Sequence, residues 1–265
     1  MLVNGAPRPK AFRLTGGESI RADLGDDEPL RSEGPAVPIR FEDEHLLVVA
    51  KPAGLVTHPT ARRRTGTLVN RLLGMGVDLS SVNGPLRPGI VHRLDAGTSG
   101  LMIIAKDDGT HRALARAFAA HAIDRRYLAL VRGRVEHDAF AVDAPLGRRA
   151  ARVTVAVGEG RAARTRFAAR ERFPEATLLE AIPRTGRTHQ IRVHLASIGH
   201  PILGDRAYGG AGMDATRLGL DRPFLHSWRI AFDHPGGGGR IELEEPLPRD
   251  LETALAALRA GAPAA

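Results

Sequence analysis

Apolar residues along the chain follow two periods, and each period predicts a different kind of element. Residues 46–50 form an uninterrupted apolar run that ends at Lys51-Pro52 and predicts a buried strand. Apolar residues at 68, 72 and 73 predict a short helix, and residues 90–107 (IVHRLDAGTSGLMIIAKD) read as strand, turn and strand. From Asp107 to Ile123, apolar positions 114, 117, 118 and 122 predict an amphipathic helix with Asp108 or Thr110 as its N-cap.

The rest of the chain continues this mixture. Residues 125–135 and 177–183 read as strands. A helix is predicted from about residue 188, because positions 191, 195 and 198 are apolar and Gly199 and Pro201 then stop it. Residues 250–261 predict an Ala-rich helix ending at Gly261. Since strands and helices mix without strict alternation, we predict an α+β domain on a mixed, mostly antiparallel sheet with flanking helices and loops.

The chain divides into three parts by composition. Residues 26–36 are rich in Gly, Pro and charge and are predicted to be a linker. Residues 1–25 hold two turn signals, Val-Asn-Gly and Thr-Gly-Gly, between short strand-like pieces that are too few to bury a core. Residues 37–265 are dense in apolar positions and are long enough for one large domain.

Composition excludes several classes of protein and site. The chain is 43% hydrophobic and 26% charged, as soluble globular proteins are, and no apolar run approaches a membrane span. Its N-terminus has no apolar core of the signal-peptide kind. It has no cysteine, which excludes disulfides, zinc–thiolate sites, iron–sulfur clusters and thiol nucleophiles. These features predict a cytoplasmic protein.

The charge balance indicates a polyanionic partner. Lys plus Arg number 38 against 30 Asp plus Glu, for a formal net charge of +8. Such an excess favours RNA or DNA. Aromatic residues make up only 4%, whereas passive single-strand binders use several for stacking. This argues against a simple binding module and draws attention to Tyr127 and Tyr208.

Common catalytic motifs are absent from the sequence. It has no phosphate-binding GxxxxGK[ST] loop, and Ser99 lies in Thr-Ser-Gly and not in a GxSxG elbow. His189, His194 and His200 lack HExxH spacing, so no metal or cofactor is predicted.

One carboxylate, Asp95, stands out against this background. It follows Arg93 and precedes a turn of small residues, so it could simply cap that turn. Arg192, however, falls early in a predicted helix, where a cation opposes the helix dipole and calls for a phosphate or carboxylate partner. An aspartate paired with an arginine stays ionised and can act as a nucleophile.

Several segments together resemble the RluA-type pseudouridine synthases. The stretch HRLDAGTSG (92–100) looks like the signature of that family. Four further stretches resemble family segments in the same order and spacing: residues 45–59, 125–133, 184–210 and 224–235. The likeness covers about residues 37–260, so it does not arise by chance.

The resemblance implies an isomerase that converts uridine in RNA to pseudouridine without redox change, energy input, metal or other cofactor. By position, Asp95 is the catalytic aspartate of the family, which attacks the sugar or assists its deprotonation. Tyr127 matches the tyrosine that stacks on the flipped uracil and serves in proton transfer from carbon 5. Arg192 matches the arginine that pairs with the aspartate.

The same likeness assigns substrate-binding residues. Arg93 matches the arginine that enters the RNA helix in place of the flipped base. Ile191 is expected to add to the apolar wall of the pocket, and His58 and Thr98 are expected to support the site.

Residues 57–73 and the N-terminal segment most resemble the RluD-like branch, which modifies large-subunit ribosomal RNA. Residues 2–24 look like the second half of an RNA-binding domain of the ribosomal-protein S-four type, from a misassigned start codon or a natural truncation. A plain hairpin extension is the alternative. Two competing functions remain: the same reaction on transfer RNA, and non-catalytic RNA binding as a ribosome-assembly factor. A monomer is expected for this family.

Overall fold

The computed structural model describes residues 2–9, 12–21, 29–60, 63–150 and 152–261. Its contacts divide the chain into two compact units, Met1–Leu30 and Arg31–Ala265. Residues 29–36 of the expected linker form neither helix nor strand, whereas residues 26–28 lie outside the described residues.

The first unit is a small antiparallel sheet in the order β2-β1-β3, with β1 at Leu2–Val3, β2 at Ala6–Pro7 and β3 at Ile20–Arg21. Asn4 and Gly5 both have positive φ, so the Val-Asn-Gly signal makes the tight turn between β1 and β2. Among the described residues of this unit, only Val3 is buried, so the sheet has little core. The assignment of residues 1–25 to half of an S-four-type domain stays a prediction.

The second unit is built on a nine-stranded sheet, and its order confirms the predicted mixed, mostly antiparallel architecture. Along the sheet lie β4 (Ile39–Glu42), β5 (Leu46–Lys51), β6 (Ser99–Ala105), β13 (Leu225–Asp233), β7 (Asp124–Arg132), β12 (Ala176–Pro183), β11 (Arg164–Arg172) and β8 (Ala139–Asp143). The ninth strand, β14 (Arg240–Glu244), pairs with β13. Among the described pairs of this sheet, only β6 with β13 is parallel. A separate hairpin is formed by β9 (Leu146–Arg149) and β10 (Arg152–Val155).

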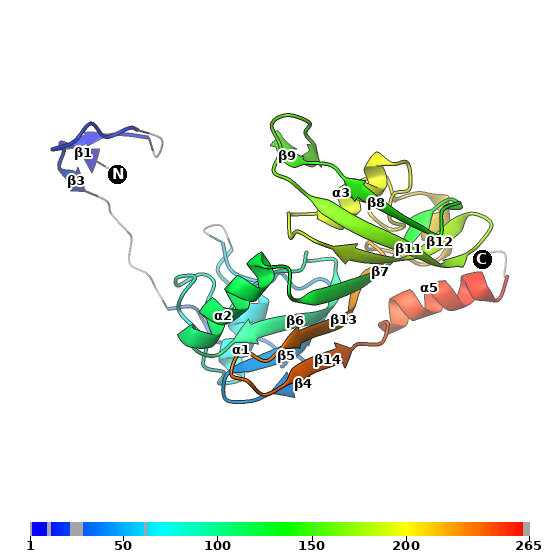
Figure 1. Cartoon of the computed structure of the whole chain (residues 1–265), viewed down its shortest axis with the longest axis horizontal. Helices are drawn as coiled ribbons and strands as arrows, with labels where there is room; N and C mark the ends of the chain where they lie inside the picture. Colours follow the sequence, from blue (N-terminus) through cyan, green and yellow to red (C-terminus); the bar gives the residue numbers. More distant parts are fainter. Residues whose placement is uncertain (1, 10–11, 22–28, 61–62, 151, 262–265) are drawn as a thin grey trace. The chain divides into compact units, whose positions relative to one another are not determined.

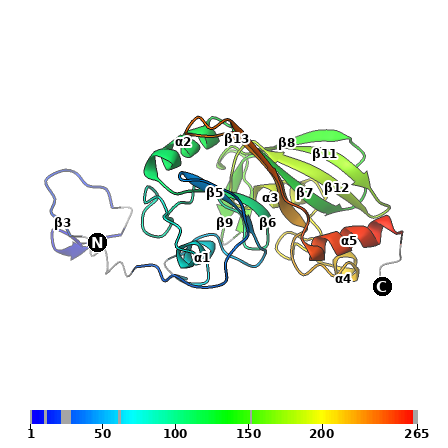
Figure 2. The same ribbon diagram turned by 90° about the horizontal axis from the view of Figure 1, so that it is seen from below.

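Helices cover the sheet at both ends, as Figures 1 and 2 show. They are α1 (Leu68–Gly74), α2 (Asp108–Ala119), α3 (Gln190–Ser197), α4 (Met213–Arg217) and α5 (Arg249–Arg259). The helices expected near residues 68, 107, 188 and 250 are therefore present. No helix in the described ranges is long and apolar enough to cross a membrane.

Two local predictions in this region are wrong. The N-cap of α2 is Asp107, not Asp108 or Thr110, because its carboxylate accepts the Thr110 amide at 2.8 Å. The expected strand before the Asp95 turn does not form, and Ile90 makes only an isolated bridge. His92 Nε2 instead accepts the Ile103 amide at 2.9 Å, so a side chain takes the donor that a strand would use.

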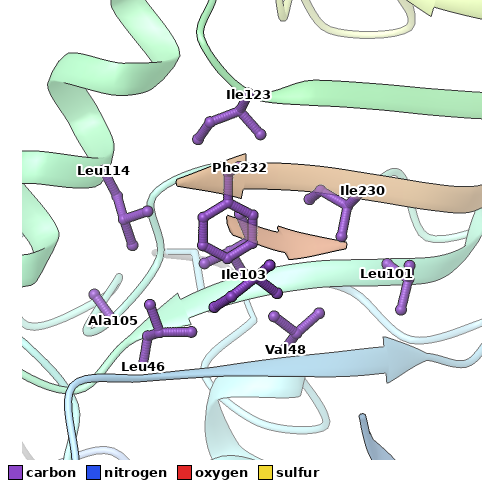
Figure 3. Close-up of a cluster of buried hydrophobic side chains, with 10 residues drawn as sticks. Leu46, Val48, Leu101, Ile103, Ala105, Leu114, Ile123, Ile230 and Phe232 are labelled. Atoms are coloured by element: carbon purple, nitrogen blue, oxygen red, sulfur yellow. The ribbon is translucent and has the colours of Figure 1, made fainter. Parts of the chain in front are cut away.

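A core of buried hydrophobic side chains fixes the β5–β6–β13 part of the sheet beneath α2 (Figure 3). Alternate residues of the strands point into it, and α2 contributes Leu114. Fully burying a side chain such as Ile103 contributes about 1.5–3 kcal/mol relative to leaving it exposed. The buried members are Leu46, Val48, Leu101, Ile103, Ala105, Leu114, Ile123, Ile230, Phe232 and Ile241.

Gly100 allows β6 to lie against β13. Its φ is +112°, and a Cβ at this position would be 2.2 Å from the Ser227 carbonyl oxygen. The two strands pair in parallel at this point, Ser99 with His226 and Gly100 with Ser227. The turn that carries Asp95 is thereby placed beside the centre of the sheet.

Successive residues of β7 point to opposite faces of the sheet, one that carries the pocket and one that carries ion pairs. Tyr127 lies opposite Ala181 of β12, on the face where α3 packs through a 2.9 Å hydrogen bond between His194 and Thr165. The neighbouring residue Arg126 points to the other face.

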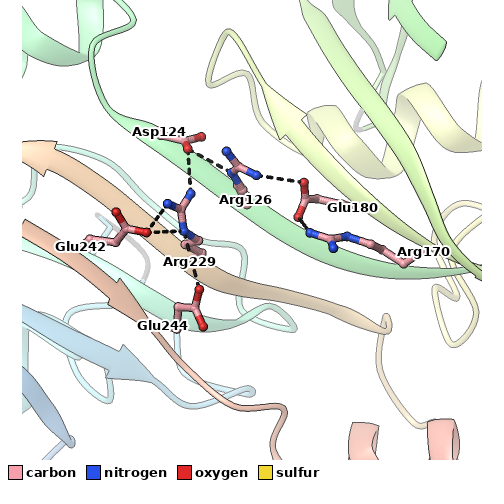
Figure 4. Close-up of polar contacts among 7 residues, drawn as sticks. All are labelled: Asp124, Arg126, Arg170, Glu180, Arg229, Glu242 and Glu244. Atoms are coloured by element: carbon pink, nitrogen blue, oxygen red, sulfur yellow. Dashed lines mark hydrogen bonds and ion pairs between the residues drawn. The ribbon is translucent and has the colours of Figure 1, made fainter. Parts of the chain in front are cut away.

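That other face carries a network of ion pairs, drawn in Figure 4. The carboxylate of Glu180, only 5% exposed, accepts from Arg126 at 3.3 Å and from Arg170. Arg229 donates to Asp124 at 3.0 Å and also pairs with Glu242 and Glu244. The network ties together five strands, β7, β11, β12, β13 and β14, behind the pocket.

Candidate active site

The turn that carries Asp95 is held from the end of β5. The Thr98 amide donates to the Asp95 carbonyl at 3.1 Å, which closes the turn. The Ala96 carbonyl accepts from the Gly54 amide at 2.8 Å and from Lys51 Nζ at 3.4 Å. Lys51 is 1% exposed, and burial lowers its pKa to about 7 against the opposing effect of the Asp95 carboxylate. The backbone around Asp95 is therefore fixed independently of its side chain.

Arg192 joins two carboxylates. Its Nη1 donates to Asp95 Oδ2 at 3.1 Å, while Nε and Nη2 donate to the two oxygens of Asp205 at 2.7 and 2.9 Å. Burial acts to lower the pKa of Arg192, but the hydrogen bonds and charges of Asp205 and Asp95 outweigh it and raise the pKa. Arg192, which lies early in α3 and was expected to need an anionic partner, thus has two.

Tyr127 stands on β7 in the same pocket. Its side chain is almost fully buried. Burial raises the pKa of Tyr127, so the ring is a neutral phenol at physiological pH. A neutral aromatic ring at the edge of a pocket offers a face on which a planar base can stack.

The structure brings six of the seven expected site residues into one open pocket. These six are Arg93, Asp95, Thr98, Tyr127, Ile191 and Arg192. Arg93 is exposed at this pocket, whereas Thr98 and Ile191 are buried in its wall. The seventh, His58, is buried and lines the adjoining pocket, which it shares with Arg93.

Sequence reasoning missed Asp205, His189 and Tyr208 as members of the site. Asp205 is completely buried in the loop between α3 and α4, where a Cβ at Gly210 would lie 1.6 Å from the Ile202 carbonyl oxygen. The sequence offered only a partial signal: an arginine presents five donors in a fixed fork, and one carboxylate satisfies only part of them, but no spacing indicates where the second carboxylate lies.

The three histidines weighed as metal ligands have separate partners. His194 hydrogen-bonds to Thr165 and to the Ala144 carbonyl, and His200 to the Arg132 carbonyl at 2.9 Å. Across the ranges that the structure describes, no group of three or more His, Cys, Asp or Glu side chains is placed to hold a metal ion.

Comparisons with known proteins identify the family of this chain. Residues 45–197 match the family model for RNA pseudouridylate synthase. The uncharacterized RNA pseudouridine synthase YlyB of Bacillus subtilis (strain 168) is 40% identical over 263 residues, covering 98% of this chain and 86% of that protein. The ribosomal large subunit pseudouridine synthase D of Nitrosomonas europaea is 44% identical over 256 residues, covering 93% of this chain and 73% of that protein.

Solved structures share the fold. The human protein RNA Pseudouridylate Synthase Domain Containing 4 superposes with a TM-score of 0.65 at 24% identity, over 84% of this chain and 93% of its own. The human Domain Containing 1 protein gives 0.62 at 23% identity, over 90% and 98%. Because the family model spans more than half of the chain and close relatives cover nearly all of it, this chain belongs to the RNA pseudouridylate synthase family of isomerases.

Proposed function

We propose that this enzyme isomerises uridine to pseudouridine in large-subunit ribosomal RNA and that Asp95 is its catalytic carboxylate. The observation that carries the proposal is the 3.1 Å hydrogen bond from Arg192 to Asp95 beside a pocket that Tyr127 also lines. A carboxylate held in this way can attack a carbon atom or accept a proton.

The reaction keeps every atom of the nucleoside. The bond from the sugar to nitrogen 1 of uracil breaks, the base turns, and carbon 5 forms the new bond to the sugar. Carbon 5 gives up its proton and nitrogen 1 gains one. Asp95 either attacks the sugar or assists its deprotonation, and both routes need the carboxylate on the sugar side of the pocket.

The other pocket residues fit binding of an unstacked uridine. A flipped base must leave the helix and be held against apolar and aromatic side chains. Tyr127 offers a stacking face and Ile191 an apolar wall. Arg93 is exposed at the pocket, where it can fill the gap left in the RNA. We propose supporting roles for Thr98 and His58, which are buried beside them.

A basic pocket next to the first supports an RNA partner. Arg87, Arg93, Arg125, Arg184 and Arg187 line it, and no Asp or Glu does. Within the described chain, no ion pair joins any of these five to a carboxylate, although Arg40, Arg222 and Arg259 elsewhere are all paired. We propose that RNA phosphates supply the missing negative charge.

The choice of large-subunit ribosomal RNA rests on relatives with that substrate in their names, including those of Nitrosomonas europaea and Zymomonas mobilis. We further expect a monomer that acts in the cytoplasm. The test is a map of pseudouridine, at single-nucleotide resolution, in total RNA from cells with and without the gene.

Loss of one or a few large-subunit sites, restored by the wild-type gene and not by Asp95→Asn, is the expected result. Loss at a transfer-RNA site would keep the reaction and change the substrate. An unchanged map, with RNA binding intact, would favour a non-catalytic assembly factor.

A further inference from the structure

The backbone at His189 is unusual. With φ 55° and ψ 19° it lies in the left-handed region, which few residues other than glycine adopt. It occupies the N-cap position of α3, yet its side chain makes no capping hydrogen bond. Such an outlier costs free energy and often accompanies a functional constraint on the side chain.

The imidazole instead lies between Tyr208 and Asp95. His189 Nδ1 is 2.8 Å from the Tyr208 hydroxyl, and Nε2 is 3.8 Å from Asp95 Oδ2. The Tyr208 ring is itself fixed, because the guanidinium carbons of Arg192 and Arg152 lie 4.9 and 4.8 Å from its centroid. The imidazole orientation is therefore set by a residue that does not depend on substrate.

The contact with Tyr208 indicates which ring nitrogen of His189 carries the proton. Burial raises the pKa of Tyr208, so its hydroxyl keeps its proton. His189 Nδ1, 2.8 Å from the hydroxyl, is placed to accept that proton. A neutral imidazole that accepts at Nδ1 must carry its hydrogen on Nε2, the nitrogen that faces Asp95.

We propose that His189 is a positioning residue for Asp95, with its Nε2–H as the second donor to the carboxylate. The inference rests on the proposed role of Asp95. Arg192 Nη1 and His189 Nε2 both approach Oδ2 of Asp95. Together they pin that oxygen and leave Oδ1 to face the sugar. The 3.8 Å separation is longer than a hydrogen bond, and we expect it to shorten when RNA is bound, because catalytic hydrogen bonds often tighten only in the substrate complex.

The charges around His189 suit a neutral donor. It faces Asp95, Arg192, Asp205 and Arg93. Burial lowers the pKa of His189, the carboxylates raise it, and the arginines lower it, with a net shift downward. The imidazole thus adds a donor without a second full positive charge beside Arg192.

Three substitutions separate positioning from a structural role. In His189→Gln the amide nitrogen can reach the place of Nε2, in His189→Asn only that of Nδ1, and His189→Ala has no donor. Loss of one hydrogen bond to a charged group corresponds to roughly 10- to 100-fold in rate. We expect kcat to fall by that factor in the Asn and Ala variants, to fall only a few-fold in the Gln variant, and KM to change little.

Stability should follow a different order. Asparagine tolerates positive φ better than alanine or glutamine, so His189→Asn should melt at the highest temperature of the three. If His189 were merely structural, activity would follow stability and the Asn variant would be the most active. That order, or wild-type kcat in all three variants, would overturn the inference.

A direct readout does not depend on turnover. In protein labelled with ¹⁵N-histidine, the chemical shifts of the two ring nitrogens report which one is protonated. The wild type should show His189 as the Nε2–H form, and Tyr208→Phe should weaken that preference. An Nδ1–H form in the wild type would contradict the proposal. Full turnover by Asp95→Asn would reject the proposed function itself, whereas an inactive Asp95→Asn with a fully active His189→Ala would reject only this inference.

Discussion

Arg192 is the residue on which the geometry of the pocket depends most. Its guanidinium fork is divided between Asp205, which takes two donors, and Asp95, which takes one. The bidentate pair with buried Asp205 fixes the plane of the guanidinium, and that plane sets where the remaining donor meets Asp95. A residue distant from the substrate thus determines the position of the proposed catalytic carboxylate.

Asp205→Asn should therefore damage both stability and activity. Removing one partner of a buried pair leaves Arg192 undercompensated and should lower the free energy of unfolding by about 3 kcal/mol. We expect kcat to fall at least about tenfold, because the donor to Asp95 is no longer held. Urea unfolding and steady-state kinetics measure both. The matched control is Asp221→Asn, an exposed aspartate paired with exposed Arg206, which should behave as wild type. Equal behaviour of the two variants would show that Asp205 does not position Arg192.

At the scale of elements, the site is made where a turn, a strand and a helix meet. The turn at Asp95 precedes β6, Tyr127 comes from β7, and Arg192 comes from α3. Gly100 allows β6 to pair in parallel with β13, and β13 in turn pairs with β7. The Asp95 turn and Tyr127 are thereby brought together. His92 then attaches the segment before Asp95 to β6 by accepting the Ile103 amide.

That hydrogen bond makes stability depend on pH. Burial, aided by the charge of Arg125, lowers the pKa of His92 from the ordinary 6.5 to about 3. The neutral ring can then accept the Ile103 amide through Nε2. Below pH 6.5 the unfolded chain binds a proton here and the native chain does not, so the free energy of unfolding falls as the pH drops from 6.5 towards 3. At pH 5 the loss from this group is up to about 2 kcal/mol.

Denaturant unfolding of the wild type and of His92→Gln at pH 7 and pH 5 isolates this effect. The wild type should lose more stability on acidification than the variant, in which a side-chain carbonyl can accept the same amide without titrating. The same acid-induced loss in both proteins would mean that His92 is not the group responsible.

The pattern of apolar residues predicted those helices and strands that a short stretch of sequence is enough to specify. The apolar run at 46–50, the helices near 68, 107, 188 and 250, and the sheet class all follow from spacing. The strand expected at 90–93 is absent because the His92 side chain replaces a backbone partner, and α2 is capped one residue earlier than expected. Periodicity gives no information on such side-chain to backbone contacts.

The site was predicted less completely. Six expected residues line one pocket because a family resemblance supplied their positions. Asp205 and His189 were missed as site members, since their roles depend on contacts between α3, the loop after it and the Asp95 turn. Those contacts join residues up to about a hundred positions apart, as Arg192 and Asp95 are. No local pattern in a single sequence encodes them.

At the scale of the whole molecule, positive charge is unevenly neutralised. Ion pairs hold the face behind the sheet together, whereas the basic pocket beside Asp95 has five arginines and no acidic residue. An enzyme with this distribution should bind RNA through phosphates, with strong dependence on salt.

Arg87→Gln and Arg184→Gln should each weaken binding of all RNA fragments to a similar degree. Each variant should reduce the slope of log Kd against log salt concentration by about one, since one phosphate contact is lost. Arg217→Gln is the control, because Arg217 is exposed on α4 and lines neither pocket. Binding titrations at several salt concentrations measure the slopes. A loss confined to one sequence, or an equal effect of Arg217→Gln, would argue against phosphate contacts in this pocket.

The most direct test of the central claim follows carbon 5 of uracil. Formation of pseudouridine removes the hydrogen at that carbon, so RNA labelled there with tritium releases the label to water. Wild-type enzyme should release tritium from large-subunit ribosomal RNA, whereas Asp95→Asn should bind that RNA with unchanged affinity and release about a thousandfold less. Release by Asp95→Asn at the wild-type rate would contradict the claim that Asp95 is the catalytic carboxylate.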